Sequence, residues 1–75
     1  MKDKALSRSI GRNIRRWRRT RLMTVTDLAA KLRVSSVHVW RMEAGDNAFA
    51  IGLLARTCKV LHIGLSELVN RPDLF

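Results

Sequence analysis

Residues 24–45 read TVTDLAAKLRVSSVHVWRMEAG, a stretch that predicts two short amphipathic helices joined by a tight turn. Thr24 and Asp27 stand three positions apart before an apolar run, which is the spacing of a capping box at a helix start. Ser35 is a favourable N-cap for a second helix, and Gly45 suits the left-handed residue that ends one. The stretch therefore predicts a helix, a turn and a second helix.

The turn is expected over residues 33–35, and apolar residues recur at helical spacing on both sides of it. The helix before the turn would bury Val25, Leu28, Ala29 and Leu32. An earlier helix would bury one face, made by Leu6, Ile10, Ile14 and Trp17. On the helix after the turn, the residues expected to point inward are Val39 and Met42.

Two more helices are expected near the C-terminus, one from Ala50 to Leu61 and a short one from Leu65 to Val69. The apolar face of the longer helix would carry Ile51, Leu54, Ala55, Cys58 and Leu61. Pro72 should prevent the short helix from extending. The sequence thus predicts an all-α fold, a compact bundle of five short helices without a strand.

A chain of 75 residues is the length of one domain. Its expected divisions are a basic N-terminal arm over residues 1–8, a helical domain over residues 9–70 and a short tail over residues 71–75. The apolar content of 47% leaves material for a dimer interface.

Charge is the second informative feature, because the formal net charge is +9. Nine of the fifteen lysines and arginines lie within the first 21 positions, where Asp3 is the only acid. This imbalance favours a partner of high negative charge density, and nucleic acid comes first. On the first helix, the side opposite the apolar face would carry Arg12, Arg15, Arg16 and Arg19. The alternative for these arginines is an ordinary solvated surface.

Residues suited to catalysis or metal binding are sparse. His38 and His62 are the only histidines and Cys58 is the only thiol, with no zinc-site spacing among them. We therefore expect no enzyme activity, no metal and no cofactor. Cys58 falls on an expected core face, which favours an inert buried thiol over a redox sensor. A single cysteine, without a signal peptide or a membrane span, favours a cytoplasmic location.

The outward face of the helix after the turn combines residues that can contact base edges. Ser36, Val37, Trp40 and Arg41 fall within about 140° of its surface. Arg41 can bond guanine O6 and N7, Val37 can pack on a thymine methyl group, and Ser36 can bond either kind of base. Trp40 could stack over Arg41, cover a thymine methyl group or lie along the sugar-phosphate wall. The alternatives are that Val37 and Trp40 belong to the core and that Arg41 is an ordinary surface arginine.

The order of these features resembles the phage repressor/Cro family of helix-turn-helix domains, also called the xenobiotic-response-element (XRE) family. The resemblance spans roughly residues 9–69 and rests on Leu28-Ala29, Val34-Ser35, Glu43-x-Gly45 and Leu61-x-Ile63-x-x-x-x-Leu68. It implies a lambda-repressor-like bundle that binds double-stranded DNA as a homodimer, with its third helix in the major groove. It also implies an ion pair between Arg18 and Glu43. Phosphate contacts are implied for Thr24, Val25, Ser35, His38 and Asn47.

Four positions depart from the family pattern. Val25 replaces a glutamine that often bonds phosphate, so only its backbone N–H remains for that contact. Arg33 replaces the turn glycine, and a left-handed conformation there would cost roughly 1 kcal/mol. Asp46 stands where the family tends to be basic, and Trp40 stands where it is commonly small or polar.

The expected function is that of a sequence-specific transcriptional regulator, a repressor, that binds a palindromic operator with half-sites about 34 Å apart. The alternative is an antitoxin-like or adaptor protein whose main role is binding a partner protein, with DNA binding for autoregulation. The partner would then contact Leu65, Leu68, Val69, Leu74 and Phe75, which otherwise serve self-association or core closure. RNA or anionic-membrane binding by the first helix is disfavoured, because the core needs the apolar face of that helix.

Overall fold

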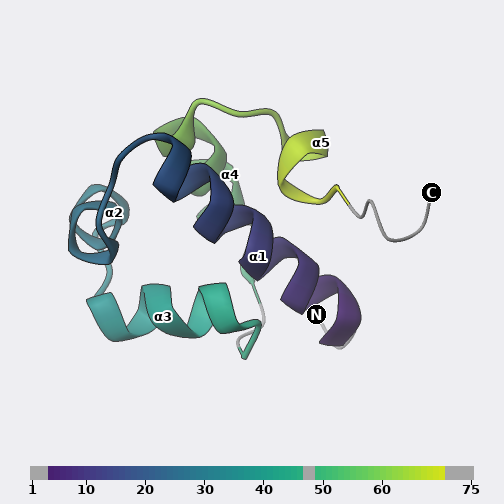
Figure 1. Ribbon diagram of the computed structural model, residues 1–75. Coiled ribbons are helices and arrows are strands. Elements are labelled where there is room, and N and C mark those ends of the chain that lie inside the picture. Colours follow the sequence, from purple (N-terminus) through teal and green to yellow (C-terminus); the bar gives the residue numbers. More distant parts are fainter. Residues whose placement is uncertain (1–3, 47–48, 71–75) are drawn as a thin grey trace.

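The computed structural model describes residues 4–46 and 49–70, and over that part of the chain it contains five α-helices and no strand (Figure 1). The helices are α1 (Lys4–Thr20), α2 (Val25–Leu32), α3 (Ser36–Ala44), α4 (Ile51–Leu61) and α5 (Leu65–Leu68). The predicted all-α bundle is confirmed. The arm expected over residues 1–8 is helical from Lys4 onward, and the expected tail at 71–75 lies outside the described residues.

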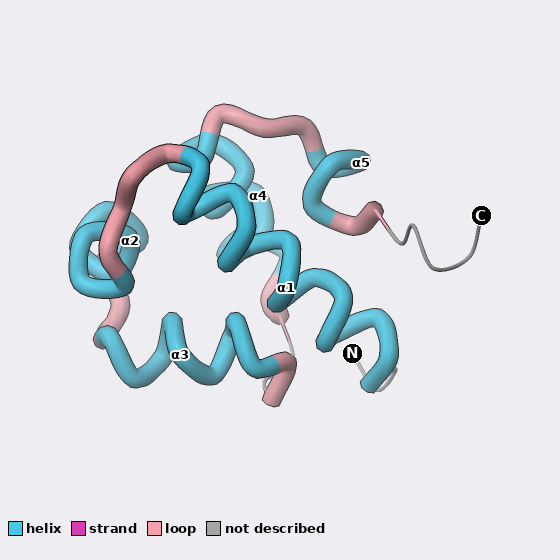
Figure 2. The backbone as a smooth tube through the Cα atoms, viewed as in Figure 1, coloured by secondary structure: helices cyan, strands magenta, loops and turns pink. Residues whose placement is uncertain are grey.

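The helix α1 runs diagonally through the middle of the bundle (Figure 2). It packs against α3 on one side and against α4 and α5 on the other, and α2, which follows α1 after a loop, packs against α3 and α4. The α1–α5 contact is held by the amide of Asn13, which donates to the carbonyls of Leu68 at 2.7 Å and Asn70 at 2.8 Å. The placement leaves α3 on the opposite side of α1 from α4 and α5.

The expected start of α2 and the expected end of α3 are confirmed in atomic detail. The Thr24 hydroxyl accepts from the Asp27 N–H at 3.0 Å, and the Asp27 carboxylate accepts from the Thr24 N–H at 2.9 Å. These hydrogen bonds, led by the one from the Thr24 backbone, lower the pKa of the Asp27 carboxyl from its ordinary value. Gly45 ends α3 with φ of 77°. Arg33 adopts the left-handed conformation that its place in the turn requires, with φ of 60°.

The core lies where α1, α2, α3 and α4 meet, and α5 closes one side of it. Its largest fully buried side chains are Ile10, Ile14, Leu28, Leu32, Val39, Met42, Thr57, Leu61 and Leu68. Three residues expected in the core only pack against its edge, namely Leu6, Trp17 and Val25. The Trp17 ring is covered by the guanidinium groups of Arg16 and Arg21, which lie 5.5 and 5.2 Å from its centroid.

The expected inward face of α4 was partly wrong. Ile51 is 85% exposed and Ala55 is also exposed, whereas Leu53 and Thr57, which were not expected in the core, are buried. The reason is that α4 is apolar on more than one side, so several orientations satisfy its sequence equally well. Packing against α1 and α2 selects one of them, and it leaves Ile51 in solvent.

Candidate nucleic-acid interface

The helix α3 is amphipathic in the expected sense. Val37 is 52% exposed and Trp40 is 61% exposed, Arg41 is exposed and Ser36 is half-buried. The opposite side of the helix is fully buried, at Val39 and Met42. The alternative that Val37 and Trp40 belong to the core is therefore wrong. A valine and a tryptophan are exposed here beside an arginine. A partner that covers them would remove apolar surface from water, which favours binding.

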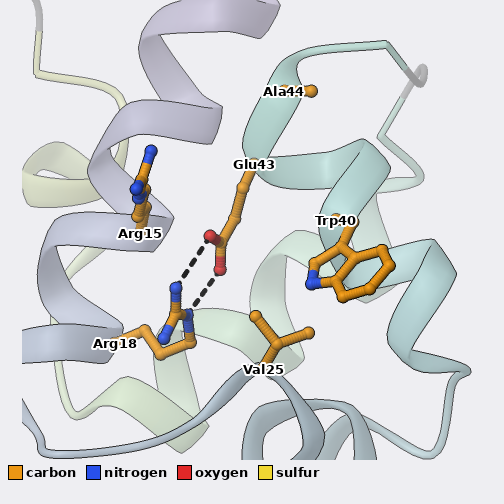
Figure 3. A pocket seen from close by; sticks show the side chains of 6 residues that line it. All are labelled: Arg15, Arg18, Val25, Trp40, Glu43 and Ala44. Atoms are coloured by element: carbon orange, nitrogen blue, oxygen red, sulfur yellow. Dashed lines mark hydrogen bonds and ion pairs between the residues drawn. The ribbon is translucent and has the colours of Figure 1, made fainter.

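A buried ion pair between α1 and α3 fixes the position of α3 relative to α1 (Figure 3). The Arg18 guanidinium donates to both carboxylate oxygens of Glu43, from Nε at 2.6 Å and from Nη2 at 3.0 Å. Its third hydrogen bond reaches the Met23 carbonyl at 2.9 Å, just before α2. The Glu43 hydrogen bond raises the pKa of Arg18, and burial opposes that effect. The ion pair that the resemblance implies is confirmed, and together with the Met23 contact it ties α1 to α3 and to the segment before α2.

A cleft opens beside the ion pair, where α1, α2 and α3 meet. Its lining residues are Arg15, Arg18, Val25, Trp40, Glu43 and Ala44. Figure 3 shows the Trp40 indole lying across from Val25, with its ring nitrogen turned toward the cleft. Trp40 thus stands beside the first turn of α2, which places it next to the expected phosphate contact at Val25.

The residues expected to contact phosphate lie at the starts of two helices. Thr24 and Ser35 are the exposed N-caps of α2 and α3, and Val25 is half-buried as the first residue of α2. His38 is half-buried, and its N–H donates to the Ser35 hydroxyl at 3.1 Å. Helix N-termini favour anions, because their free N–H groups and the helix dipole both carry partial positive charge. Asn47 lies outside the described residues.

Residues 9–69, most of the chain, match the sequence model of a family described as a helix-turn-helix domain. The chain belongs to this helix-turn-helix family. No curated protein matches the chain in sequence. The membership agrees with the geometry, in which the second and third helices form the turn unit and α3 presents its outer face.

Solved structures with the same fold as this helix-turn-helix domain include a gene regulator, a controller protein and a hypothetical transcription factor. The clp gene regulator ClgR from C. glutamicum is 27% identical with a TM-score of 0.79, over 84% of this chain and 82% of its own. The restriction-modification controller protein C.AhdI from Aeromonas hydrophila is 20% identical with a TM-score of 0.80, over 85% and 97%. The hypothetical transcription factor NHTF from Neisseria is 18% identical with a TM-score of 0.84, over 96% and 84%.

One residue of the helix-turn-helix surface was missed as part of the site. Arg15 lines the cleft beside Trp40 and Glu43, although the sequence placed it only among the charged residues of the first helix. The sequence could have indicated this position of Arg15 through its spacing from Arg18, because residues three positions apart lie on the same side of a helix. Since Arg18 was expected to reach toward α3, Arg15 on the same side was a candidate as well.

The described part of the domain also bears on metal binding, membrane spanning and thiol reactivity. No group of three or more His, Cys, Asp or Glu side chains there could hold a metal ion. None of the described helices is long and apolar enough to cross a membrane. Burial raises the pKa of the Cys58 thiol above its ordinary value, so this side chain stays protonated and unreactive near neutral pH.

Proposed function

We propose that this helix-turn-helix domain is a sequence-specific transcriptional repressor that binds a palindromic operator in double-stranded DNA as a homodimer. The observation that carries the proposal is the exposed outer face of α3, with Val37, Trp40 and Arg41 in solvent. The net charge of +9 supplies the attraction to DNA that is independent of sequence. The regulators and transcription factors among the solved structures of this fold support a role in transcription.

In this proposal α3 enters the major groove, and each of its exposed side chains contacts a different part of the DNA. Arg41 donates to guanine O6 and N7, and Val37 packs on a thymine methyl group. Ser36, at the first turn of α3, bonds a neighbouring base edge. Trp40 borders the base-reading face and the cleft, so its indole covers the sugar-phosphate wall while its apolar edge faces the groove.

Phosphates on either side of the groove would contact the two helix starts. The N–H of Val25 and the hydroxyl of Thr24 hold one phosphate at the start of α2, and Ser35 with His38 holds another at the start of α3. Asn47 is proposed as a further contact after α3. These contacts fix the register of α3 on the duplex and carry no sequence information of their own.

Arg41→Ala should weaken binding to the preferred operator by about 1–3 kcal/mol and should relax the preference at one base position of each half-site. The measurement is a titration of operator duplexes that carry each base in turn at every position. Arg56→Ala removes the same charge from α4 and should leave the preference intact. An equal loss of affinity on every sequence would instead make Arg41 a phosphate contact.

The homodimer is proposed to form through the α4–α5 patch, which consists of Ile51, Leu54, Ala55, Cys58 and Leu65. Ile51 is 85% and Leu65 is 57% exposed, although both are apolar. Two copies with a net charge of +9 repel each other, so they should meet where no side chain is charged, and this patch meets that condition. The patch belongs to helices on the opposite side of α1 from α3, which leaves both reading helices free (Figure 1).

Ile51→Lys should convert the dimer into a monomer, because it places a cation in an apolar contact between two already basic chains. Sedimentation measures the mass, and operator affinity should fall with the loss of the dimer. Leu22→Lys is the matched control, since Leu22 is 91% exposed but lies in the turn between α1 and α2. It should remain dimeric.

The alternative of an antitoxin-like or adaptor protein would use the same patch for a different protein. Of the residues expected to contact such a partner, Leu68 is fully buried and cannot do so, and Leu65 is exposed. Val69 is half-buried, and Leu74 and Phe75 lie outside the described residues. A wild-type chain that stays monomeric would contradict the homodimer and favour this alternative.

A further inference from the structure

Apart from the outer face of α3, the domain has a basic surface on α1, which takes no part in the proposed reading of bases. The arginine ridge, as we name it, lines a shallow groove on the solvent side of α1 and consists of Arg12, Arg15, Arg16 and Arg19. The helix α1 contains no acidic residue. Like charges four positions apart, such as Arg12 with Arg16 and Arg15 with Arg19, destabilise a helix by roughly 0.2–0.5 kcal/mol per pair. The ridge therefore works against the stability of the isolated fold.

Two arginines next to the ridge are held by hydrogen bonds, whereas in the ridge itself Arg16 lies over the Trp17 ring, a contact that leaves its charge without a counter-charge. Arg18 pairs with Glu43, and Arg21 donates to the carbonyls of Leu61 at 2.8 Å and His62 at 3.3 Å at the end of α4. Within the described residues, the Arg18–Glu43 contact is the one ion pair, so no ridge arginine has a carboxylate partner there. The ridge is thus a concentration of positive charge that the fold itself does not neutralise.

The apolar side of α1 is buried in the core, and this limits the kinds of anionic partner that the ridge can bind. Ile10 and Ile14 are fully buried, so α1 cannot turn an apolar face toward a lipid surface. What remains exposed is a row of guanidinium groups that suits a chain of phosphates. Arg12 and Arg19 are seven residues apart, or about 10 Å along the helix. One strand of a duplex carries about three phosphates over that length of its axis.

Arg15 connects the ridge to the site already described. It lines the groove of the ridge and also the cleft that contains Trp40 and the start of α2. A DNA strand that passes the cleft thus meets Arg15 first and the rest of the ridge beyond it. The two surfaces form one continuous track rather than two separate sites.

We infer that the arginine ridge binds the phosphate backbone of the same duplex that α3 reads, in the flank just outside each half-site. The inference rests on the proposed DNA binding and extends it to sequence-independent contacts beyond the operator. Arg12 and Arg19 bind flanking phosphates, and Arg15 joins them to the cleft. The ridge lengthens the footprint and increases the salt dependence of binding without changing the preferred sequence.

The test uses the full chain and two operator duplexes of the sequence that it selects from a random library. One duplex ends at the operator, and the other continues for about ten base pairs on each side, one turn of the double helix. The variant is Arg12→Gln/Arg19→Gln, and the control is Arg56→Gln/Lys59→Gln, which removes the same charge from exposed positions of α4. Affinity is measured over a series of salt concentrations.

On the long duplex, the ridge variant should lower the slope of log affinity against log salt by about 2 for each protomer, because each lost phosphate contact contributes about 0.9. On the short duplex, the ridge variant and the wild type should have the same slope. The control variant should keep the wild-type difference between the two duplexes. Neutral methylphosphonate linkages in the flanks should weaken the wild type but not the ridge variant.

A ridge variant that behaves like the control on both duplexes would overturn the inference and leave the ridge as a solvated surface. An equal decrease in slope on both duplexes would also overturn it, because the charge would then act as a general field. Thermal unfolding checks that the variant folds, and removal of like charges should leave its midpoint unchanged or higher. A wild type that binds operator and scrambled duplexes equally would contradict the proposed function itself, and the ridge contact with it.

Discussion

Glu43→Ala should lower the free energy of unfolding by about 3 kcal/mol, the range in which removing one partner of a buried ion pair falls. The side chains of Arg18 and Glu43 are only 10% and 9% exposed, so the variant leaves a nearly buried guanidinium without its carboxylate. Urea denaturation measures the change. Sequence preference should stay the same at temperatures where the variant is folded. The reason is that the Glu43 side chain points toward Arg18 on α1 and not toward the outer face of α3.

The control for this prediction replaces both partners, as in Arg18→Met/Glu43→Leu. Apolar residues of similar volume remove the stranded charge, so the double variant should recover most of the lost stability. Equal stability of the Glu43→Ala variant and the wild type would contradict the role given to the pair. It would mean that α1 and α3 are held together by apolar packing alone.

Gly11→Ala should destabilise the domain by about 2–3 kcal/mol, although alanine is the better helix former by about 1 kcal/mol. A Cβ at Gly11 would lie 2.5 Å from the carbonyl oxygens of Met42 and Glu43. These are backbone atoms of α3, which cannot move without separating α3 from α1. The loss should therefore appear in both the unfolding midpoint and the affinity for the operator.

Gly52→Ala is the matched control in the first turn of α4, where a new Cβ would meet nothing within 4 Å. It should leave stability unchanged or raise it by up to about 1 kcal/mol through helix propensity alone. If Gly11→Ala instead raised stability to the same extent, the close contact between α1 and α3 would be wrong.

Much of the fold was predictable because its signals are local. The capping box at Thr24 and Asp27, the N-cap at Ser35 and the terminator at Gly45 each depend on residues within one helical turn. The left-handed conformation of Arg33 could be anticipated only through the resemblance to the family, which has a glycine at that place in the turn. The outer face of α3 followed from periodicity, because Val39 and Met42 lie on one side of the helix and Val37, Trp40 and Arg41 on the other.

The orientation of α4 was not predictable from its own sequence. Ile51, Leu53 and Leu54 are adjacent or nearly so, and they point in different directions around the helix. Only the neighbours of α4 decide which of them is buried, and that information comes from contacts distant in sequence. The sequence did group most of the α4–α5 patch on one apolar face of the helix, but it assigned that face to the core rather than to the surface.

The cleft beside Trp40 was hidden for a related reason. It exists because α1 crosses α3 closely enough at Gly11 to bring Arg15 beside the end of α3. A sequence pattern gives the face on which Arg15 lies but not the angle at which the two helices cross. The ion pair between Arg18 and Glu43 was predictable only through the resemblance to a family, since 25 positions separate the two residues.

Selection from a random duplex library tests our claim that α3 of a dimer reads a DNA sequence. The purified chain is incubated with the library at near-physiological salt, and the bound duplexes are recovered and sequenced. We predict enrichment of a palindrome whose half-sites lie about 10 base pairs apart, one helical turn. Recovery of unenriched sequence, with only weak binding that disappears as salt rises, would contradict the claim.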